Sequence, residues 1–105
     1  MAGNAVGMIE VYGLVAAFAA CDAGCKAANV TVEPFDKNKP ARPEGLPVPL
    51  QVLVKFRGSV EDVTAAVEAA EAAVKRITGV VTKHIIPGME DQATGMLHLN
   101  AFDKK

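Results

Sequence analysis

The sequence predicts an α+β fold in which four short strands form one antiparallel sheet and two helices cover one face of it. The 105-residue chain has the length of one domain. Four short runs rich in β-branched residues are separated by turn residues and by two longer segments with apolar residues at helical spacing. Their order, β-α-β-β-α-β, is the split βαβ or ferredoxin-like arrangement. We expect a single domain over residues 1–105, with a core at 5–88 and a C-terminal extension at 89–105.

The first half of the chain predicts a strand, a helix and a second strand. A strand over 6–12 ends at Gly13, and a helix follows over 14–28. The larger apolar residues of this helix recur at helical spacing and predict its buried face, which consists of Leu14, Phe18, Cys21, Cys25 and Ala28. A second strand covers 30–35. Because Pro34 has no N–H for a strand ladder, this strand lies at a sheet edge or bends there.

The second half begins with a loop over 36–49, which is rich in proline. A strand is predicted over 50–57, and its side chains alternate between two faces. One consists of Leu50, Val52, Val54 and Phe56, and the other of Gln51, Leu53, Lys55 and Arg57. Ser59 caps the second helix, which ends before Gly79. Its predicted buried stripe consists of Val60, Val63, Val67, Ala70, Val74 and Ile77. A last strand covers 80–86, and apolar residues between Met96 and Phe102 predict that the tail docks elsewhere on the protein.

Composition excludes several classes of partner. Eleven basic and twelve acidic residues give a net charge of −1, so no basic excess drives nucleic-acid binding. No apolar run approaches the roughly 20 residues of a membrane span, and the N-terminus lacks a basic signal-peptide region. We therefore expect a cytosolic protein with reduced cysteines. Much of the apolar content is alanine, which buries little area, so we expect assembly to supply part of the stability.

The residues that could carry chemistry favour structural roles. Cys21 and Cys25 are interpreted as small buried thiols, because a disulfide needs converging Cβ vectors and a metal site needs two more ligands. His84 and His98 are the only histidines, and neither has a matched carboxylate pattern. Gly7 and Gly13 do not form a phosphate-binding G-x-G-x-x-G. The sequence therefore predicts no enzyme, no metal and no cofactor.

Two motifs carry a resemblance to a known family. Residues 7–17 read G-M-I-E-V-Y-G-L-V-A-A, and residues 21–30 read C-D-A-G-C-K-A-A-N-V. Both resemble the opening strand and first helix of the hexameric bacterial microcompartment shell proteins, and the similarity continues to Pro87. The resemblance implies a structural homohexamer that binds neighbouring hexamers and other shell proteins. These tiles form the facets of a cytoplasmic shell around enzymes, with a central pore for small metabolites.

The resemblance assigns Lys26 and Asn29 to the edge of the hexamer. In the family, the edge lysine lies along its partner on the neighbouring hexamer. Taken by themselves, the residues favour a simpler interpretation, in which Lys26 is a solvated cation near the negative end of a helix dipole. The family commonly places an arginine after the proline that ends the fourth strand. Here that position is Gly88, which removes a contact across the edge.

The resemblance also places the loop between the second and third strands at the pore. The family's I-G-S-G motif is absent here and the loop is several residues longer, so the pore candidates are Lys37, Asn38, Lys39, Arg42, Glu44 and Gly45. Lys37, Lys39 and Arg42 outnumber Asp36 and Glu44, and a ring of excess positive charge favours anions. Alternatively, this loop protrudes from the surface and never reaches the pore.

A second class of function stays open at this point. Trimeric ferredoxin-like regulatory proteins also carry a long charged loop between the second and third strands. Such a protein would bind a small anionic effector through the 36–49 loop, with Lys37, Lys39 and Arg42 as ligands. The nucleotide-binding motifs of that class are absent, and an enzyme that uses His84 or a thiol has less support still. The size of the oligomer distinguishes the two hypotheses, because the shell protein would have six copies and the regulatory protein three.

Overall fold

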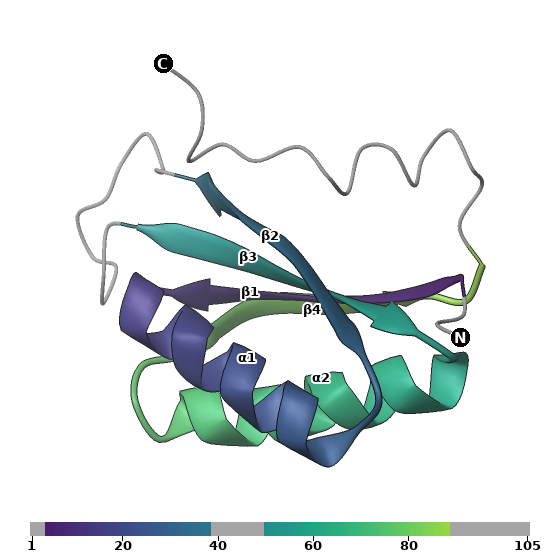
Figure 1. Ribbon diagram of the computed structural model, residues 1–105. Coiled ribbons are helices and arrows are strands. Elements are labelled where there is room, and N and C mark those ends of the chain that lie inside the picture. Colours follow the sequence, from purple (N-terminus) through teal and green to yellow (C-terminus); the bar gives the residue numbers. More distant parts are fainter. Residues whose placement is uncertain (1–3, 39–49, 89–105) are drawn as a thin grey trace.

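The structure, a computed structural model, describes residues 4–38 and 50–88. Within them, four strands form one antiparallel sheet, and two helices lie side by side on one of its faces (Figure 1). The elements in chain order are β1 (Ala5–Tyr12), α1 (Leu14–Ala27), β2 (Thr31–Asn38), β3 (Gln51–Gly58), α2 (Val60–Lys75) and β4 (Val80–Ile86). The sheet order is β2-β3-β1-β4. This arrangement confirms the predicted α+β, ferredoxin-like fold. The predicted C-terminal extension at 89–105, with its docking segment, lies outside the described residues.

The core lies between the sheet and the two helices. The largest fully buried side chains on this side are Phe56, Ile9, Val11, Val52, Val54, Val63 and Val74. α2 buries the middle of the predicted stripe, Val63, Val67, Ala70 and Val74, but the stripe was wrong at its two ends, because Val60 begins the helix and Ile77 follows it and both are exposed. α1 contributes only Ala16, Ala17, Ala20 and Gly24. Small residues let a helix lie close to its neighbours, and α1 packs tightly against α2.

Two glycines make these close approaches possible. A Cβ added to Gly24 would lie 2.5 Å from Cζ of Phe56, and one added to Gly7 would lie 2.7 Å from Cγ2 of Val67. Real Cβ atoms essentially never come so close to another heavy atom. Gly24 on α1 therefore fits over a core phenylalanine, and Gly7 on β1 fits under α2.

The start of α2 is fixed by the predicted cap. The backbone N–H of Asp62 donates to Oγ of Ser59 at 3.1 Å, and that hydroxyl donates to Oδ2 of Asp62 at 3.0 Å. The other oxygen of this carboxylate accepts from the backbone N–H of Asn29 at 3.4 Å. Asp62 also stabilises the positive end of the helix dipole. The cap thus ties the end of α1 to the beginning of α2.

The second strand is longer than the sequence predicted. β2 continues through Pro34 to Asn38, so Asp36, Lys37 and Asn38 belong to a strand rather than to a loop. Pro34 is accommodated in both of the predicted ways. β2 is an edge strand, and its register against β3 shifts between Glu33 and Asp36.

The predicted buried face of α1 was wrong. Leu14, Phe18 and Cys25 are exposed and Cys21 is half-buried, whereas the alanines and Gly24 face the core. The reason is steric, because the space above Phe56 accepts a glycine and the helix must turn its smallest residues inward. The two thiols are therefore not core fillers. The larger apolar residues of α1 lie along its outer side, next to the edge strand β2.

Candidate functional site

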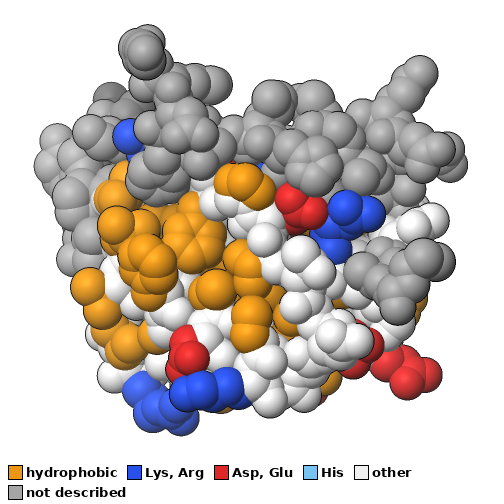
Figure 2. Space-filling view, viewed as in Figure 1, with side chains coloured by type: hydrophobic (Ala, Val, Ile, Leu, Met, Phe, Trp, Pro, Cys, Tyr) orange, Lys and Arg blue, Asp and Glu red, His pale blue; other side chains and the backbone are white. Residues whose placement is uncertain are grey.

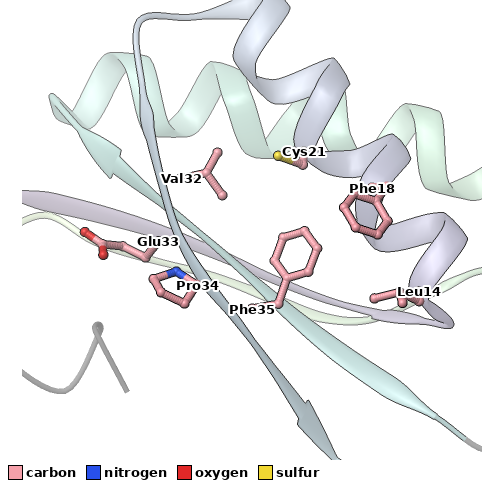
Figure 3. A pocket seen from close by; sticks show the side chains of 7 residues that line it. All are labelled: Leu14, Phe18, Cys21, Val32, Glu33, Pro34 and Phe35. Carbon is pink, nitrogen blue, oxygen red and sulfur yellow. The ribbon is translucent and has the colours of Figure 1, made fainter. Parts of the chain in front are cut away.

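An apolar groove lies between α1 and the edge strand β2. It has a volume of about 520 Å³ and is lined by Leu14, Phe18, Cys21, Val32, Glu33, Pro34 and Phe35. Val32 and Phe35 project from β2 toward α1, where the rings of Phe18 and Phe35 meet edge to face (Figure 3). Their centroids are 5.4 Å apart. Phe18 nevertheless stays 61% exposed.

Exposed apolar side chains are concentrated on this side of the molecule. Figure 2 shows hydrophobic side chains gathered over α1 and β2 in the view of Figure 1. Leu14, Val15 and Phe18 supply three of the six large hydrophobic residues that stay exposed in the described structure. A contiguous apolar surface rimmed by polar groups is typical of a protein–protein interface. The sequence pattern found Leu14 and Phe18 but assigned them to the core.

The opposite edge of the sheet, at β4, exposes fewer apolar side chains and more charged ones than the groove does. β4 forms this edge and carries the exposed Val81, and Ile77 lies exposed just before it. A smaller pocket of about 250 Å³ is lined by Thr64, Val67, Glu68, Lys83, His84 and Ile85.

Two lysines surround Glu71 beside this edge. Nζ of Lys83 lies 2.8 Å from Oε1 of Glu71, and Nζ of Lys75 lies 3.3 Å from Oε2 of Glu71. The hydrogen bond from Lys83, helped by Lys75, lowers the pKa of Glu71.

The predicted edge residues lie at the C-terminal end of α1. Nζ of Lys26 is 2.9 Å from Oδ2 of Asp22, one helical turn earlier, and the Lys26 side chain is 76% exposed. Asn29 follows the helix and is exposed. Its backbone N–H is bonded to Asp62, while its side chain lies at the surface. The two residues therefore lie on accessible surface close together, and Asp22 is a charged neighbour that the sequence analysis did not single out.

A charge cluster that the sequence analysis missed lies on the sheet face away from the helices. Glu33 of β2 pairs in register with Lys55 of β3, and its Oε2 lies 3.4 Å from Nη1 of Arg57. Glu33 and Lys55 are only 7% and 4% exposed. Burial lowers the pKa of Lys55, and the nearby Asp36 and Glu33 oppose that shift. These opposite charges hold the edge strand β2 on the sheet. The alternation of β3 indicated a polar face but not its burial.

The thiols show no sign of activation. The pKa of Cys21 is raised by burial first, and then by Cys25 and Asp22, so the thiol stays protonated at neutral pH.

Across residues 4–38 and 50–88, no three His, Cys, Asp or Glu side chains gather as metal ligands. Neither helix in the described part of the chain is long and apolar enough to cross a membrane.

Comparison with known proteins decides the family. The sequence model of the BMC domain matches residues 5–89. The chain belongs to the BMC domain family. Two of its relatives are PduA, a bacterial microcompartment shell protein of Citrobacter freundii, and CcmK3, a carboxysome shell protein of a Halothece species. PduA is 39% identical over 87 residues, covering 83% of this chain and 84% of PduA. CcmK3 is 34% identical over 102 residues, covering 95% of this chain and 91% of CcmK3.

The fold agrees with this assignment. A crystal structure of a microcompartment protein from Desulfitobacterium hafniense superimposes with a TM-score of 0.69 at 22% identity. The match covers 90% of this chain and 49% of that one. This BMC domain protein thus has a structural role in the shell of a bacterial microcompartment, a body of the bacterial cytoplasm, and is not an enzyme.

The predicted pore residues are only partly described. Lys37 lies exposed near the end of β2, and its backbone N–H donates to Oδ1 of Asp36 at 2.9 Å. The backbone of Asn38 ends the strand. Lys39, Arg42, Glu44 and Gly45 lie outside the described residues. In this BMC domain, β2 therefore leads directly from the apolar groove to the first of the predicted pore residues.

Proposed function

We propose that this BMC domain, a single shell domain with its core at 5–88, forms a cyclic homohexamer that tiles the facets of a microcompartment shell. The apolar groove between α1 and β2 carries this proposal. Phe18 and Leu14 expose apolar area that a lone chain leaves in water. Covering such area stabilises a complex by about 25 cal/mol per Å². We assign a second copy of the same chain as the partner that covers this area.

The arrangement of the two sheet edges favours a ring. The large apolar groove lies at the β2 edge, whereas the β4 edge carries a smaller pocket of about 250 Å³ and the exposed Val81, with Ile77 just before it. A contact between two unlike surfaces is heterologous, and a heterologous contact that closes makes a cyclic oligomer. We assign the β4 edge of one copy to the groove of the next. The curated relatives are shell proteins, which supports six copies.

Tiling and transport follow from the same ring. A sixfold tile fills a plane without gaps, and Lys26 with Asn29 provides the accessible polar surface at its edge. β2 leads toward the pore segment, where Lys37, Lys39 and Arg42 outnumber Asp36 and Glu44 in every copy. Repeated around a sixfold axis, this excess forms a positive ring that selects small anions. The enclosed enzymes would receive their substrates through it.

The first experiment measures mass by light scattering and images the same sample by negative-stain microscopy. Six chains of 10.9 kDa give about 65 kDa. Phe18→Ser is expected to shift the mass toward the monomer, because it removes the aromatic centre of the groove. Val60→Ser is the matched control, since Val60 is also an exposed apolar residue but does not line the groove. A trimer, or a hexamer indifferent to Phe18→Ser, contradicts the proposed ring.

A second experiment tests the pore. Replacing Lys39 and Arg42 by glutamate reverses the charge excess of the ring and is expected to weaken the binding of small carboxylate anions, measured by calorimetry on hexamers. The wild type and the double variant must have the same hexameric mass for the comparison to hold. Equal anion binding by both would place the 36–49 segment away from the pore.

A further inference from the structure

Side chains are buried on the face of the sheet that is turned away from both helices (Figure 1). Ile9 and Val11 of β1 belong to the core under the helices, and side chains alternate along a strand, so Val6 points to the other face. Val6 is nevertheless fully buried. Lys55 and Glu33, which pair in register on the same face, are almost as inaccessible. An uncovered sheet face leaves such side chains in water, so another part of the same chain covers them.

The buried patch lies near the end of the sheet at which β4 ends. Val6 pairs in register with Arg57 on one side and with Ile86, the last residue of β4, on the other. The chain after residue 88 therefore begins beside the patch. The segment 39–49 leaves and re-enters the sheet at the other end, where Asn38 pairs with Gln51. Along β3 that end lies about 20 Å from Arg57, at roughly 3.4 Å per residue.

Residues 89–105 have the length and the side chains to cover the patch. The path from β4 over β1 and β3 to β2 takes three strand spacings, or about 15 Å, which a segment of this length exceeds several times when extended. Residues 1–3 contain only one large side chain, that of Met1, and cannot cover both Val6 and Glu33. The large apolar side chains available from the C-terminal segment are Met96, Leu97, Leu99 and Phe102.

We infer that residues 89–105 fold back across the helix-free face of the sheet as a strap that covers Val6 and the Glu33–Lys55 pair. The strap excludes water from this pair, and opposite charges attract each other more strongly where water is excluded. It thereby helps to hold the edge strand β2 on the sheet. The pKa of Lys55, which burial lowers, agrees with such a cover. The inference rests on burial within a single chain and does not depend on the proposed hexamer.

Amine labelling of the full-length chain tests the inference. An N-hydroxysuccinimide ester of acetate acetylates accessible lysine amines, and mass spectrometry of the peptides gives the rate for each lysine. In the wild type we expect Lys55 to react about tenfold more slowly than Lys75, which is also paired with an acid but has a 63% exposed side chain. A lowered pKa by itself speeds acylation, so slow labelling of Lys55 reports cover. The double variant Leu97→Ser with Leu99→Ser is expected to raise the Lys55 rate about fivefold and to leave the Lys75 rate unchanged.

Leu46→Ser with Val48→Ser is the matched control, because it removes two apolar side chains from the segment 39–49 instead. We expect it to leave the labelling of Lys55 as in the wild type. A Lys55 rate that rises only in this control, or in neither double variant, would overturn the inference, and so would wild-type labelling of Lys55 as fast as that of Lys75.

A second measurement needs no substitution. Nuclear Overhauser effects between the methyl groups of Val6 and those of residues 89–105 are expected in the wild type. Their absence would overturn the strap even if the double variant fails to fold. Neither result depends on the number of copies, so a trimer or a monomer would contradict the proposed ring and leave this inference standing.

Discussion

The two halves of this domain distribute their side chains in opposite ways. In the α2–β4 half, Val63, Val67 and Val74 are buried, and the charged Lys75 and Lys83 face solvent. In the α1–β2 half, alanines and a glycine are buried while Leu14 and Phe18 are exposed. Glu33 of β2 is buried beside Lys55, and Arg57 next to it is partly exposed. The α1–β2 half therefore exposes an aromatic groove, whereas the α2–β4 half exposes only the scattered aliphatic residues Val60, Ile77 and Val81.

This difference explains how a small, alanine-rich chain can be stable. α1 gives up the area that larger inward side chains would bury, because its small residues bring it close to Phe56 and to α2. The apolar residues that it keeps outside gain their burial only when a partner covers them. Part of the hydrophobic stabilisation is thereby moved from the fold to the assembly.

The largest expected effect comes from enlarging the small inner face of α1. Gly24→Val places a branched side chain where even a Cβ would lie 2.5 Å from the ring of Phe56. We expect a loss of about 3 kcal/mol in the free energy of unfolding, measured by urea denaturation, because a close-packed core resists insertion. Adding Phe56→Leu to this variant makes room and is expected to recover part of the loss. A Gly24→Val protein as stable as the wild type would show that α1 does not depend on close approach.

A pair of carboxylates compares the two halves directly. Glu33 is almost fully buried and meets Arg57 and Lys55, whereas Glu71 is partly exposed and meets Lys75 and Lys83. Glu33→Gln removes an acidic partner of the buried Lys55 and of the partly exposed Arg57, and is expected to cost about 2 kcal/mol, since Asp36 stays near Lys55 and Arg57 retains some solvent.

Glu71→Gln is the matched control and is expected to cost clearly less, because water replaces the lost partner at the surface. Thermal unfolding at one fixed protein concentration measures both variants. Equal losses for the two would mean that the charges of the α1–β2 half are not specially buried, and the proposed contrast between the halves would fail.

The sequence predicts the elements better than it predicts their orientation. Alternation in β3 and the central residues of the α2 stripe indicate the correct inner faces, because large apolar residues are the ones buried, whereas Val60 and Ile77 at the ends of that stripe are exposed. The same rule fails for α1, where Phe18 lies on the predicted apolar stripe but the helix turns Gly24 toward Phe56, a space too tight even for a Cβ. A pattern of apolar residues shows that a face is to be covered. It does not show whether the chain itself or another copy covers it.

The candidate site divides along similar lines. Motif resemblance located Lys26 and Asn29, and the structure adds the ion pair with Asp22 that spacing alone allows but does not require. The Glu33–Lys55 pair depends on the register between β2 and β3, which is shifted next to Pro34. Such a register is set by tertiary contacts, so the sequence could not give this pair.

The smallest expected effect is a pH dependence confined to the α2–β4 half. The pKa of Glu71 lies below its ordinary value of 4.5 in the folded chain, chiefly because Lys83 donates a hydrogen bond to it and also because Lys75 is near. A carboxyl whose folded pKa is depressed adds stability above its unfolded pKa and loses that contribution as the pH falls through the folded value. Lys83→Met removes the larger cause.

We therefore expect the urea midpoint of Lys83→Met to lie below that of the wild type at pH 7, and the two midpoints to converge as the pH falls well below 4.5. Lys75→Met is the control and should show a smaller difference with the same pH course, because its Nζ lies farther from the carboxylate, at 3.3 Å rather than 2.8 Å. A gap between Lys83→Met and the wild type that stays constant with pH would mean that Lys83 acts through packing alone. The charge of Lys83 would then add nothing to stability, unlike the charges that pair with Glu33 in the α1–β2 half.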